Sequence, residues 1–211
     1  MKKPKKPSYN LEKQYLSSGI DYVFGIDEVG RGCFAGPLVA SAVCFDKKIK
    51  RKWFKDINDS KQLTAKERRR LSKLIIRHGS SYTETIDVET INKIGIGKAN
   101  TLIFKKLIKK ISNDLGKNKI QFLIDGNKKD IQIENLEFIV KGDNKIISVA
   151  AASIVAKDHR DRIMRDLGKV YRGYNLSKNK GYGTKSHQEA IKKLGLSDIH
   201  RKSFDLQKFT Q

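Results

Sequence analysis

The chain has 211 residues, enough for one sizeable hydrophobic core or for a core with a small appendage. Its 45 lysines and arginines outnumber its 23 aspartates and glutamates, which gives a formal net charge of +22. This excess indicates a polyanionic partner, most commonly nucleic acid. The alternative, that lysines only keep the surface soluble, explains scattered charge better than a total of this size.

Membrane and secreted classes are not supported by the composition. The chain has no run of about 18 apolar residues, and its charged N-terminus is not followed by the apolar stretch of a signal peptide. Cys33 and Cys44 lack Cys-x-x-Cys spacing and are expected to be reduced, small apolar residues. We therefore expect a cytoplasmic protein.

The first third of the chain predicts an arm, a short helix and two paired strands. Residues 1–8 hold four lysines and two prolines and are expected to form a mobile arm, followed by a lead-in helix over 11–16. An apolar strand then ends at Glu28. After the turn at 35–37, a second strand over 38–45 should pair antiparallel with the first, because the connection is short.

The rest of the chain predicts helices alternating with strands. Thr64 and Glu67 have the spacing of a capping box. The helix over 146–171 starts with small residues at 150–153, which would allow a close pass over a sheet. The other predicted elements are a helix over 64–77, a strand over 82–86, helical segments between 91 and 111 interrupted at Gly95 and Gly97, strands over 120–125 and 138–140, and a helix capped by Ser186 and Glu189 and ended by Gly195.

This order predicts a mixed α/β sheet flanked by helices. We divide the chain into an arm with its lead-in helix (1–19), a catalytic domain (20–175) and a C-terminal helical substrate-binding segment (176–211).

Acidic residues stand at or just after the ends of the predicted strands, where open α/β sheets gather their ligands. Asp27 and Glu28 are neighbours, so they could share a metal only where the strand ends and bends, and Gly30 and Gly32 would supply that bend. Alone, each acid would be interpreted as a cap or a surface residue. Together, four carboxylates in a basic chain predict a two-metal phosphoryl-transfer site with Mg²⁺ or Mn²⁺, because no Cys/His cluster suggests zinc. The four are Asp27, Glu28, Asp125 and Asp143.

Seven motifs in order resemble those of bacterial ribonuclease HII: GIDEVGRG (25–32), DSKQL (59–63), IDGN (124–127), KGD (141–143), AASIVAK (151–157), GYGT (181–184) with His187, and HRKSF (200–204). The resemblance implies a ribonuclease H-like fold and a divalent-metal site. It also implies hydrolysis of the RNA strand of RNA/DNA hybrids and nicking 5′ to a lone ribonucleotide in duplex DNA, which leaves 5′-phosphate and 3′-hydroxyl ends and would serve ribonucleotide excision. The related ribonuclease HIII carries an extra N-terminal domain, for which the 26 residues before Asp27 leave no room.

The resemblance also implies roles for individual residues. The family's metal-binding acids correspond to Asp27, Glu28, Asp125 and Asp143. Its 2′-hydroxyl-reading backbone and its junction tyrosine correspond to Gly30, Arg31, Gly32 and Tyr182, and the 2′-hydroxyl is what distinguishes RNA from DNA at one nucleotide. Candidate phosphate contacts are Ser60, Lys61, Lys180, Lys185 and Arg201.

Other polar and aromatic residues are expected to have structural roles. We interpret Asp158 and Asp161 as helix-surface charges, and Trp53 and Phe54 as core anchors. His78, His159 and His187 are expected at the surface or in packing, and His200 with Arg201 is expected to tether the C-terminal segment or to touch phosphate. Phe204, Leu206 and Phe209 fit a packed tail better than a replication-clamp contact.

Two further classes stay open at this point. The chain could be a basic binding protein on the same fold without activity, although a binder gains nothing from four carboxylates facing phosphate. It could also be a metal nuclease or integrase with another substrate, against which only the Gly-Arg-Gly backbone and Tyr182 argue. We expect a monomer that acts on RNA/DNA hybrids and ribonucleotide-containing duplex DNA.

Overall fold

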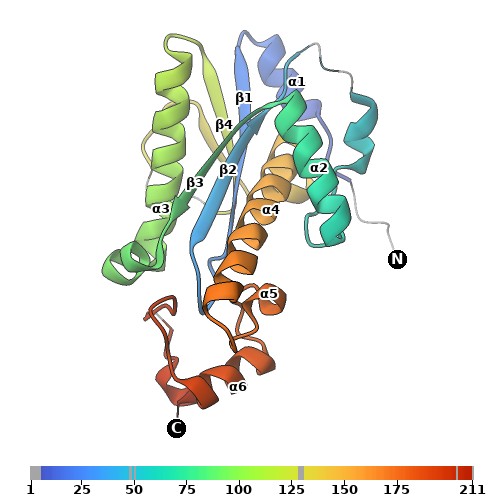
Figure 1. Cartoon of the computed structure of the whole chain (residues 1–211). Coiled ribbons are helices and arrows are strands. Elements are labelled where there is room, and N and C mark those ends of the chain that lie inside the picture. Colours follow the sequence, from blue (N-terminus) through green and yellow to red (C-terminus); the bar gives the residue numbers. More distant parts are fainter. Residues whose placement is uncertain (1–5, 48, 50, 128–130, 203, 211) are drawn as a thin grey trace.

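The computed structural model describes residues 6–47, 49, 51–127, 131–202 and 204–210. A five-stranded sheet in the order β3-β2-β1-β4-β5 forms its centre (Figure 1). β1 pairs antiparallel with β2 and parallel with β4, so the predicted mixed sheet and the antiparallel first pair are confirmed. The strands are β1 (Tyr22–Val29), β2 (Leu38–Cys44), β3 (Ser80–Ile86), β4 (Ile120–Asp125) and β5 (Leu136–Ile139).

Helices cover both faces of this sheet. α3 lies against β3 and β2 on one face, α4 crosses β1 and β2 on the other, and α2 packs on α4 (Figure 1). None of the helices in the described ranges is long and apolar enough to cross a membrane. The helical elements are α1 (Asn10–Ser17), η1 (Arg51–Asp56), α2 (Ala65–His78), α3 (Val88–Leu115), η2 (Gly142–Asn144), α4 (Ile147–Val170), α5 (Leu176–Asn179), α6 (Lys185–Leu194) and η3 (Gln207–Phe209).

The closest contact between helix and sheet occurs at Gly25. A Cβ on this residue would lie 2.2 Å from the main-chain carbon of Ser148 and from the nitrogen of Val149, so only glycine fits. The small, fully buried residues at 150–152 let α4 stay at this distance, as the sequence predicted. Asp27, two positions after Gly25, points to the same face of the sheet and therefore toward α4.

Several local signals are confirmed. Thr64 and Glu67 form the predicted capping box at the start of α2. Gly95 interrupts α3 with a φ of +81°, whereas Gly97 is helical. Trp53 and Phe54 of η1 pack in the core between α2, α4 and the sheet, as expected.

Two local predictions are wrong. The N-cap of α6 is Thr184, which accepts a hydrogen bond from the amide of His187, and Ser186 lies inside the helix. Residues 1–5 of the expected arm lie outside the described residues. The arm does not extend to Ser8, because Ser8 pairs with Ile146 and its amide donates to the Lys145 carbonyl.

The C-terminal segment lies beyond one end of the sheet (Figure 1) and packs against the loop that follows β1. Ala35 of that loop shares a small hydrophobic cluster with Met164 of α4 and Ile191 of α6. The rings of Phe204 and Phe209 lie against Phe34, with centroid distances of 5.4 and 5.8 Å. The predicted packed tail is therefore present, and it braces the loop that carries the Gly-Arg-Gly sequence.

Candidate active site

The four predicted acids lie at one edge of the sheet. Ile26 of β1 is in register with Ile124 of the parallel strand β4, so Asp27 lies beside Asp125, the last residue of β4, although β1 itself continues to Val29. Asp143 stands in η2, directly after β5, and the amide of Gly142 donates to Oδ1 of Asp125 at 2.6 Å. Three separate elements thus bring the carboxylates together.

Electrostatics show how closely these groups influence one another. Burial, followed by the charges of Glu28 and Asp125, raises the pKa of Asp27 well above its usual range. Burial and the charge of Asp125 also raise the pKa of Asp143. Asp27 and Asp143 are 7% and 6% exposed. Neighbouring carboxylates with raised pKa values form a site of concentrated negative charge, which a cation would stabilise.

Glu28 lies where the strand gives way to the Gly-Arg-Gly loop. Its carboxylate forms an ion pair of 3.6 Å with Arg31, whose side chain is more than half exposed. Gly30 has a φ of +101°, so the bend predicted after the acid pair is present. Asp27 and Glu28 themselves are still paired with β2, so they lie on opposite faces of β1, and the bend follows the last strand residue, Val29.

The donor set fits a hard divalent cation in its chemistry. All four groups supply only oxygen atoms, as Mg²⁺ and Mn²⁺ prefer. As they stand, no three histidine, cysteine, aspartate or glutamate side chains in the described residues are grouped so that they could hold a metal ion. By the chemistry of their side chains, Asp27, Glu28, Asp125 and Asp143 are the residues that would hold one.

Ser60 supports Asp27 and does not reach the surface, contrary to its prediction as a phosphate contact. It is 3% exposed, and its hydroxyl lies 2.9 Å from that of Ser153 on α4. The Ser153 hydroxyl in turn bonds the carboxylate of Asp27. Lys61, the next residue, is exposed, and its charge offsets part of the rise that burial and Asp125 cause in the pKa of Asp143, so it stands beside the acids as a phosphate contact should.

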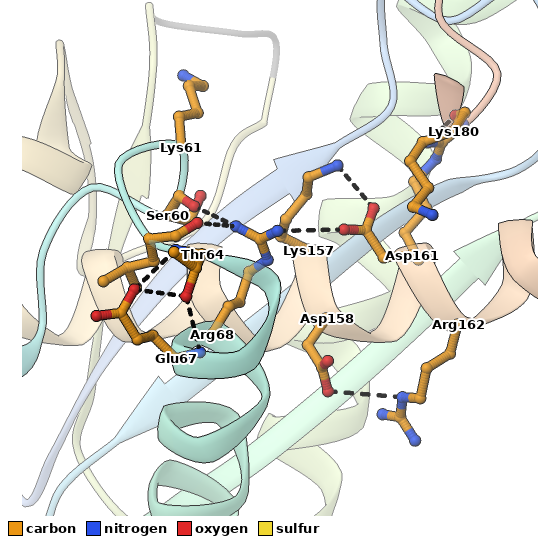
Figure 2. A network of polar contacts seen from close by, with 12 residues as sticks. Ser60, Lys61, Thr64, Glu67, Arg68, Lys157, Asp158, Asp161, Arg162 and Lys180 are labelled. Carbon is orange, nitrogen blue, oxygen red and sulfur yellow. Dashed lines mark hydrogen bonds and ion pairs between the residues drawn. The ribbon is translucent and has the colours of Figure 1, made fainter. Parts of the chain in front are cut away.

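The loop that carries Ser60 and Lys61 is held by a buried arginine that the sequence did not single out. Nη1 of Arg68 donates to the carbonyls of Ser60 and Leu63, and its Nη2 lies 3.4 Å from Asp161 on α4 (Figure 2). Asp161 also forms an ion pair of 2.7 Å with Lys157. This network fastens the Lys61 loop to the helix that passes beneath the acids.

The interpretation of Asp158 and Asp161 as surface charges is wrong. Both are buried, at 7% and 5% exposure, because α4 is covered by α2 and by the 60–63 loop. Asp158 pairs with Arg162 at 3.5 Å, and Asp161 bonds two cations (Figure 2). The helical spacing of Asp158 and Asp161 did not indicate that segments distant in the sequence cover them.

Tyr182 lies next to the Gly-Arg-Gly loop. Its main chain bridges to Cys33, and its half-exposed ring has Lys157 Nζ at 5.4 Å and Arg160 Cζ at 5.9 Å from the centroid. Burial and the neighbouring Cys33 raise its pKa to about 12, so the phenol stays neutral. The structure therefore brings together the two elements predicted to recognise a ribonucleotide junction.

Arg201 is wrongly predicted as a phosphate contact. Its side chain is fully buried and bonds the carbonyls of Gly30, Arg31 and Gly36. Lys180 is half-buried and donates to the Ser177 carbonyl, whereas Lys185 is exposed at the start of α6. Of the five predicted phosphate contacts, Lys61 and Lys185 are thus the two with exposed side chains.

Two buried histidines connect the C-terminal segment to Tyr182. Nε2 of His187 and Nε2 of His200 are 3.2 Å apart, and Nδ1 of His187 lies 2.9 Å from the Tyr182 carbonyl. The amide of Ser197 donates to Nδ1 of His200. His187 was expected at the surface or in packing, and it is buried. Of the two roles expected for His200, the tether is made through this pair, and the buried ring does not reach the surface.

Comparisons with known proteins agree on one family. The family model described as Ribonuclease HII matches residues 24–207. A Ribonuclease HII from Caldanaerobacter subterraneus subsp. tengcongensis is 43% identical over 196 residues, which is 92% of this chain and 78% of that protein. One from Fusobacterium nucleatum subsp. nucleatum is 42% identical and covers 94% and 90%.

Solved structures share the fold. The ribonuclease H2 from Pyrococcus horikoshii OT3 superposes with a TM-score of 0.68 at 25% identity, covering 90% of this chain and 99% of that one. The RNase HII in the PCNA:RNase HII complex from Archaeoglobus fulgidus gives 0.72 at 22% identity, with 87% and 95% covered. Bst-RNase HIII in complex with Mn²⁺ gives 0.72 at 20% identity, with 90% and 69% covered.

Proposed function

We propose a function from the premise that this chain belongs to the ribonuclease HII family and is therefore an endoribonuclease acting on RNA/DNA hybrids. In this proposal it also nicks 5′ to single ribonucleotides in duplex DNA. We propose two-metal phosphodiester hydrolysis as its mechanism, leaving 5′-phosphate and 3′-hydroxyl ends.

The observation that carries the proposal is that three elements bring carboxylates to one end of the sheet: Asp27 lies beside Asp125 through the register of β1 and β4, and the amide of Gly142, next to Asp143, donates to Oδ1 of Asp125 at 2.6 Å. Burial, followed by the charges of neighbouring carboxylates, raises the pKa of Asp27 and of Asp143. A nucleic-acid-binding module has no use for such repulsion beside a phosphate, whereas a hydrolase that binds cations does. When bound, Mg²⁺ or Mn²⁺ would orient water and stabilise the leaving oxygen.

The protein's own residues have separate tasks in this proposal. Ser153 holds the carboxylate of Asp27, and the amide of Gly142 holds that of Asp125. Lys61 and Arg31 are exposed cations beside the acids, suited to the phosphates of the cleaved strand. In this proposal the main chain at Gly30 to Gly32 recognises the ribose, and the ring of Tyr182, whose main chain bridges to Cys33, recognises the sugar next to it.

The test uses three substrates of one sequence: a duplex with a single ribonucleotide, a continuous hybrid, and an all-DNA duplex. Each is incubated without metal, with Mg²⁺ and with Mn²⁺, and the ends of the products are mapped. We expect a metal-dependent nick 5′ to the lone ribonucleotide and no cleavage of DNA. Cleavage of the hybrid with the single-ribonucleotide duplex left intact would overturn the junction-nicking part of the proposal.

A replication-clamp contact through residues 204–209 is a second proposal, which the sequence favoured less than a packed tail. The solved relative from Archaeoglobus fulgidus is in a complex with PCNA. In the present chain Phe204 and Phe209 pack on Phe34, and Leu206 is buried. Such a contact therefore requires the tail to leave this packing, and a pull-down with the clamp from the same cell, repeated without residues 204–211, would test it.

A further inference from the structure

Two arginines are buried beneath the loop that follows β1. Arg160 of α4 and Arg201 of the C-terminal segment are both 0% exposed. Within the described part of the chain, no carboxylate forms an ion pair with either guanidinium. Arginine is almost never fully buried unless it is paired, so this arrangement calls for a physical reason.

Main-chain carbonyls take the place of carboxylates as partners. Arg201 donates from Nη1 to Gly30 at 2.5 Å and to Arg31 at 3.1 Å, and from Nε and Nη2 to Gly36 at 2.9 and 2.7 Å. It thereby joins both ends of the loop that carries the Gly-Arg-Gly sequence. The fork of a guanidinium suits this task, because its donors lie in one plane with fixed spacing.

Arg160 joins the same loop to the Tyr182 turn. Its Nε donates to Pro37 at 2.8 Å, its Nη2 to Ala35 at 3.1 Å and its Nη1 to Lys180 at 2.7 Å. Lys180 stands two residues before Tyr182. One side chain on a rigid helix thus fixes the spacing between the loop after β1 and the turn that carries the tyrosine.

The loop and the turn also meet directly. The amide of Phe34 donates to the Gly181 carbonyl at 2.8 Å, and Cys33 bridges to Tyr182. A Cβ on Gly30 would lie 2.4 Å from Nε of Arg160, so a glycine is required where the arginine passes under the loop. Gly30 and Tyr182 therefore belong to one unit held from below by two guanidiniums.

Carbonyl dipoles alone stabilise the charge of this unit, because no acidic side chain among the described residues forms an ion pair with it. Burial lowers the pKa of Arg201 to about 10, so the group stays cationic at neutral pH. In an environment of low dielectric constant, positive charge without an acidic partner attracts an approaching anion more strongly than an exposed charge does. The anion available to this enzyme is the phosphodiester of the cleaved strand.

We propose that Arg160 and Arg201 are positioning residues for ribonucleotide recognition, which set the distance between the Gly30–Gly32 main chain and Tyr182 and add buried positive charge beneath the bound phosphodiester. The inference rests on the proposed nicking at single ribonucleotides. A duplex with one ribonucleotide can be cut only when the enzyme is bound at that nucleotide, so misplaced recognition elements slow the reaction. A continuous hybrid has a 2′-hydroxyl on every nucleotide of the RNA strand, so the enzyme can bind and cut at another position.

The experiment compares Arg201→Lys with wild type in single-turnover cleavage of both substrates. Lysine keeps the charge but lacks the planar fork. We expect the single-ribonucleotide rate to fall about tenfold or more, as small misplacements of reacting groups do, while the hybrid rate falls by less than about threefold. Arg162→Lys, on the exposed face of α4, the helix that also carries Arg160, is the control and should change neither rate.

The outcomes are distinguishable. If the wild type does not nick the single-ribonucleotide duplex, the proposed function fails, whatever the variants do. If the wild type nicks and Arg201→Lys slows both substrates equally, the arginines only stabilise the fold and the inference is wrong. Should Arg201→Lys lack a cooperative unfolding transition, Arg160→Lys gives the same comparison. If neither variant folds, the arginines serve folding and the inference is equally overturned.

Discussion

The buried ion pairs of Asp161 allow a quantitative test of the network that holds the Lys61 loop. Asp161→Asn preserves the size of the side chain and removes a charge that lies 2.7 Å from Lys157 Nζ and 3.4 Å from Arg68 Nη2. Removing one partner of a buried pair costs about 3–5 kcal/mol, because a cation is left without compensation. Arg68 keeps the carbonyls of Ser60 and Leu63 as acceptors. We therefore expect the lower end, about 3 kcal/mol.

Equilibrium unfolding in urea measures this loss. With a slope of about 3 kcal/mol/M, a loss of about 3 kcal/mol moves the midpoint by about 1 M. The thermal midpoint should fall by about 6–12 °C for a chain of this size. The matched control is Asp166→Asn on the same helix, whose ion pair with Lys169 lies at the surface. We expect no measurable shift for the control, because exposed pairs contribute little.

The network would be misassigned if Asp161→Asn moved the midpoint no more than Asp166→Asn does. That result would mean that water or a rearranged side chain compensates Lys157 and Arg68.

Four further predictions concern the site and its surroundings. Asp125→Asn should abolish cleavage and leave hybrid binding intact or stronger, because a negative charge facing phosphate is lost; near-normal turnover at saturating Mg²⁺ would contradict the assignment. Lys61→Ala should reduce the slope of log affinity against log salt by about 0.9 without moving the cut, which binding titrations at several salt concentrations can measure. Tyr182→Ala should slow single-turnover nicking at a lone ribonucleotide more than it weakens duplex binding, and an unchanged rate would make the residue structural. Burial and the neighbouring His187 lower the pKa of His200 to about 4, so the unfolded state binds a proton at a higher pH than the folded state does, and the free energy of unfolding should fall as the pH drops from about 6.5 to 4. His200→Gln should flatten this part of the plot of unfolding free energy against pH, and a plot parallel to that of the wild type would show that His200 does not cause the loss.

Local sequence pattern predicted much of the fold. The apolar run ending in Asp27, the strand over 120–125 and the capping box at Thr64 were all identified correctly, because each depends on residues within a few positions. The small residues at the start of α4 predicted its close pass over the sheet, which Gly25 permits. The neighbourhood of the four acids also followed from the predicted strands, since parallel strands point the same way, although β1 continues past Asp27 and Glu28 to Val29.

Errors occurred where a charged side chain is buried by segments distant in the sequence. Asp161 was assigned to a helix surface, but α2 and the 60–63 loop cover it. Arg201 was assigned to phosphate, yet it bonds Gly30, 171 positions earlier in the chain. Ser60 likewise turns inward to Ser153. Charge and polarity in a sequence predict exposure only when no distant partner is available.

The sequence by itself thus determined the kind of chemistry and its neighbourhood: oxygen ligands at strand ends, a basic surface, and a glycine-rich turn beside the acids. The tertiary structure decided which polar groups face the substrate and which hold the site from behind. The physical reason is that burying a guanidinium or a carboxylate is stable only when partners surround it. For Arg160, Arg201 and Asp161, those partners come together only when distant parts of the chain pack.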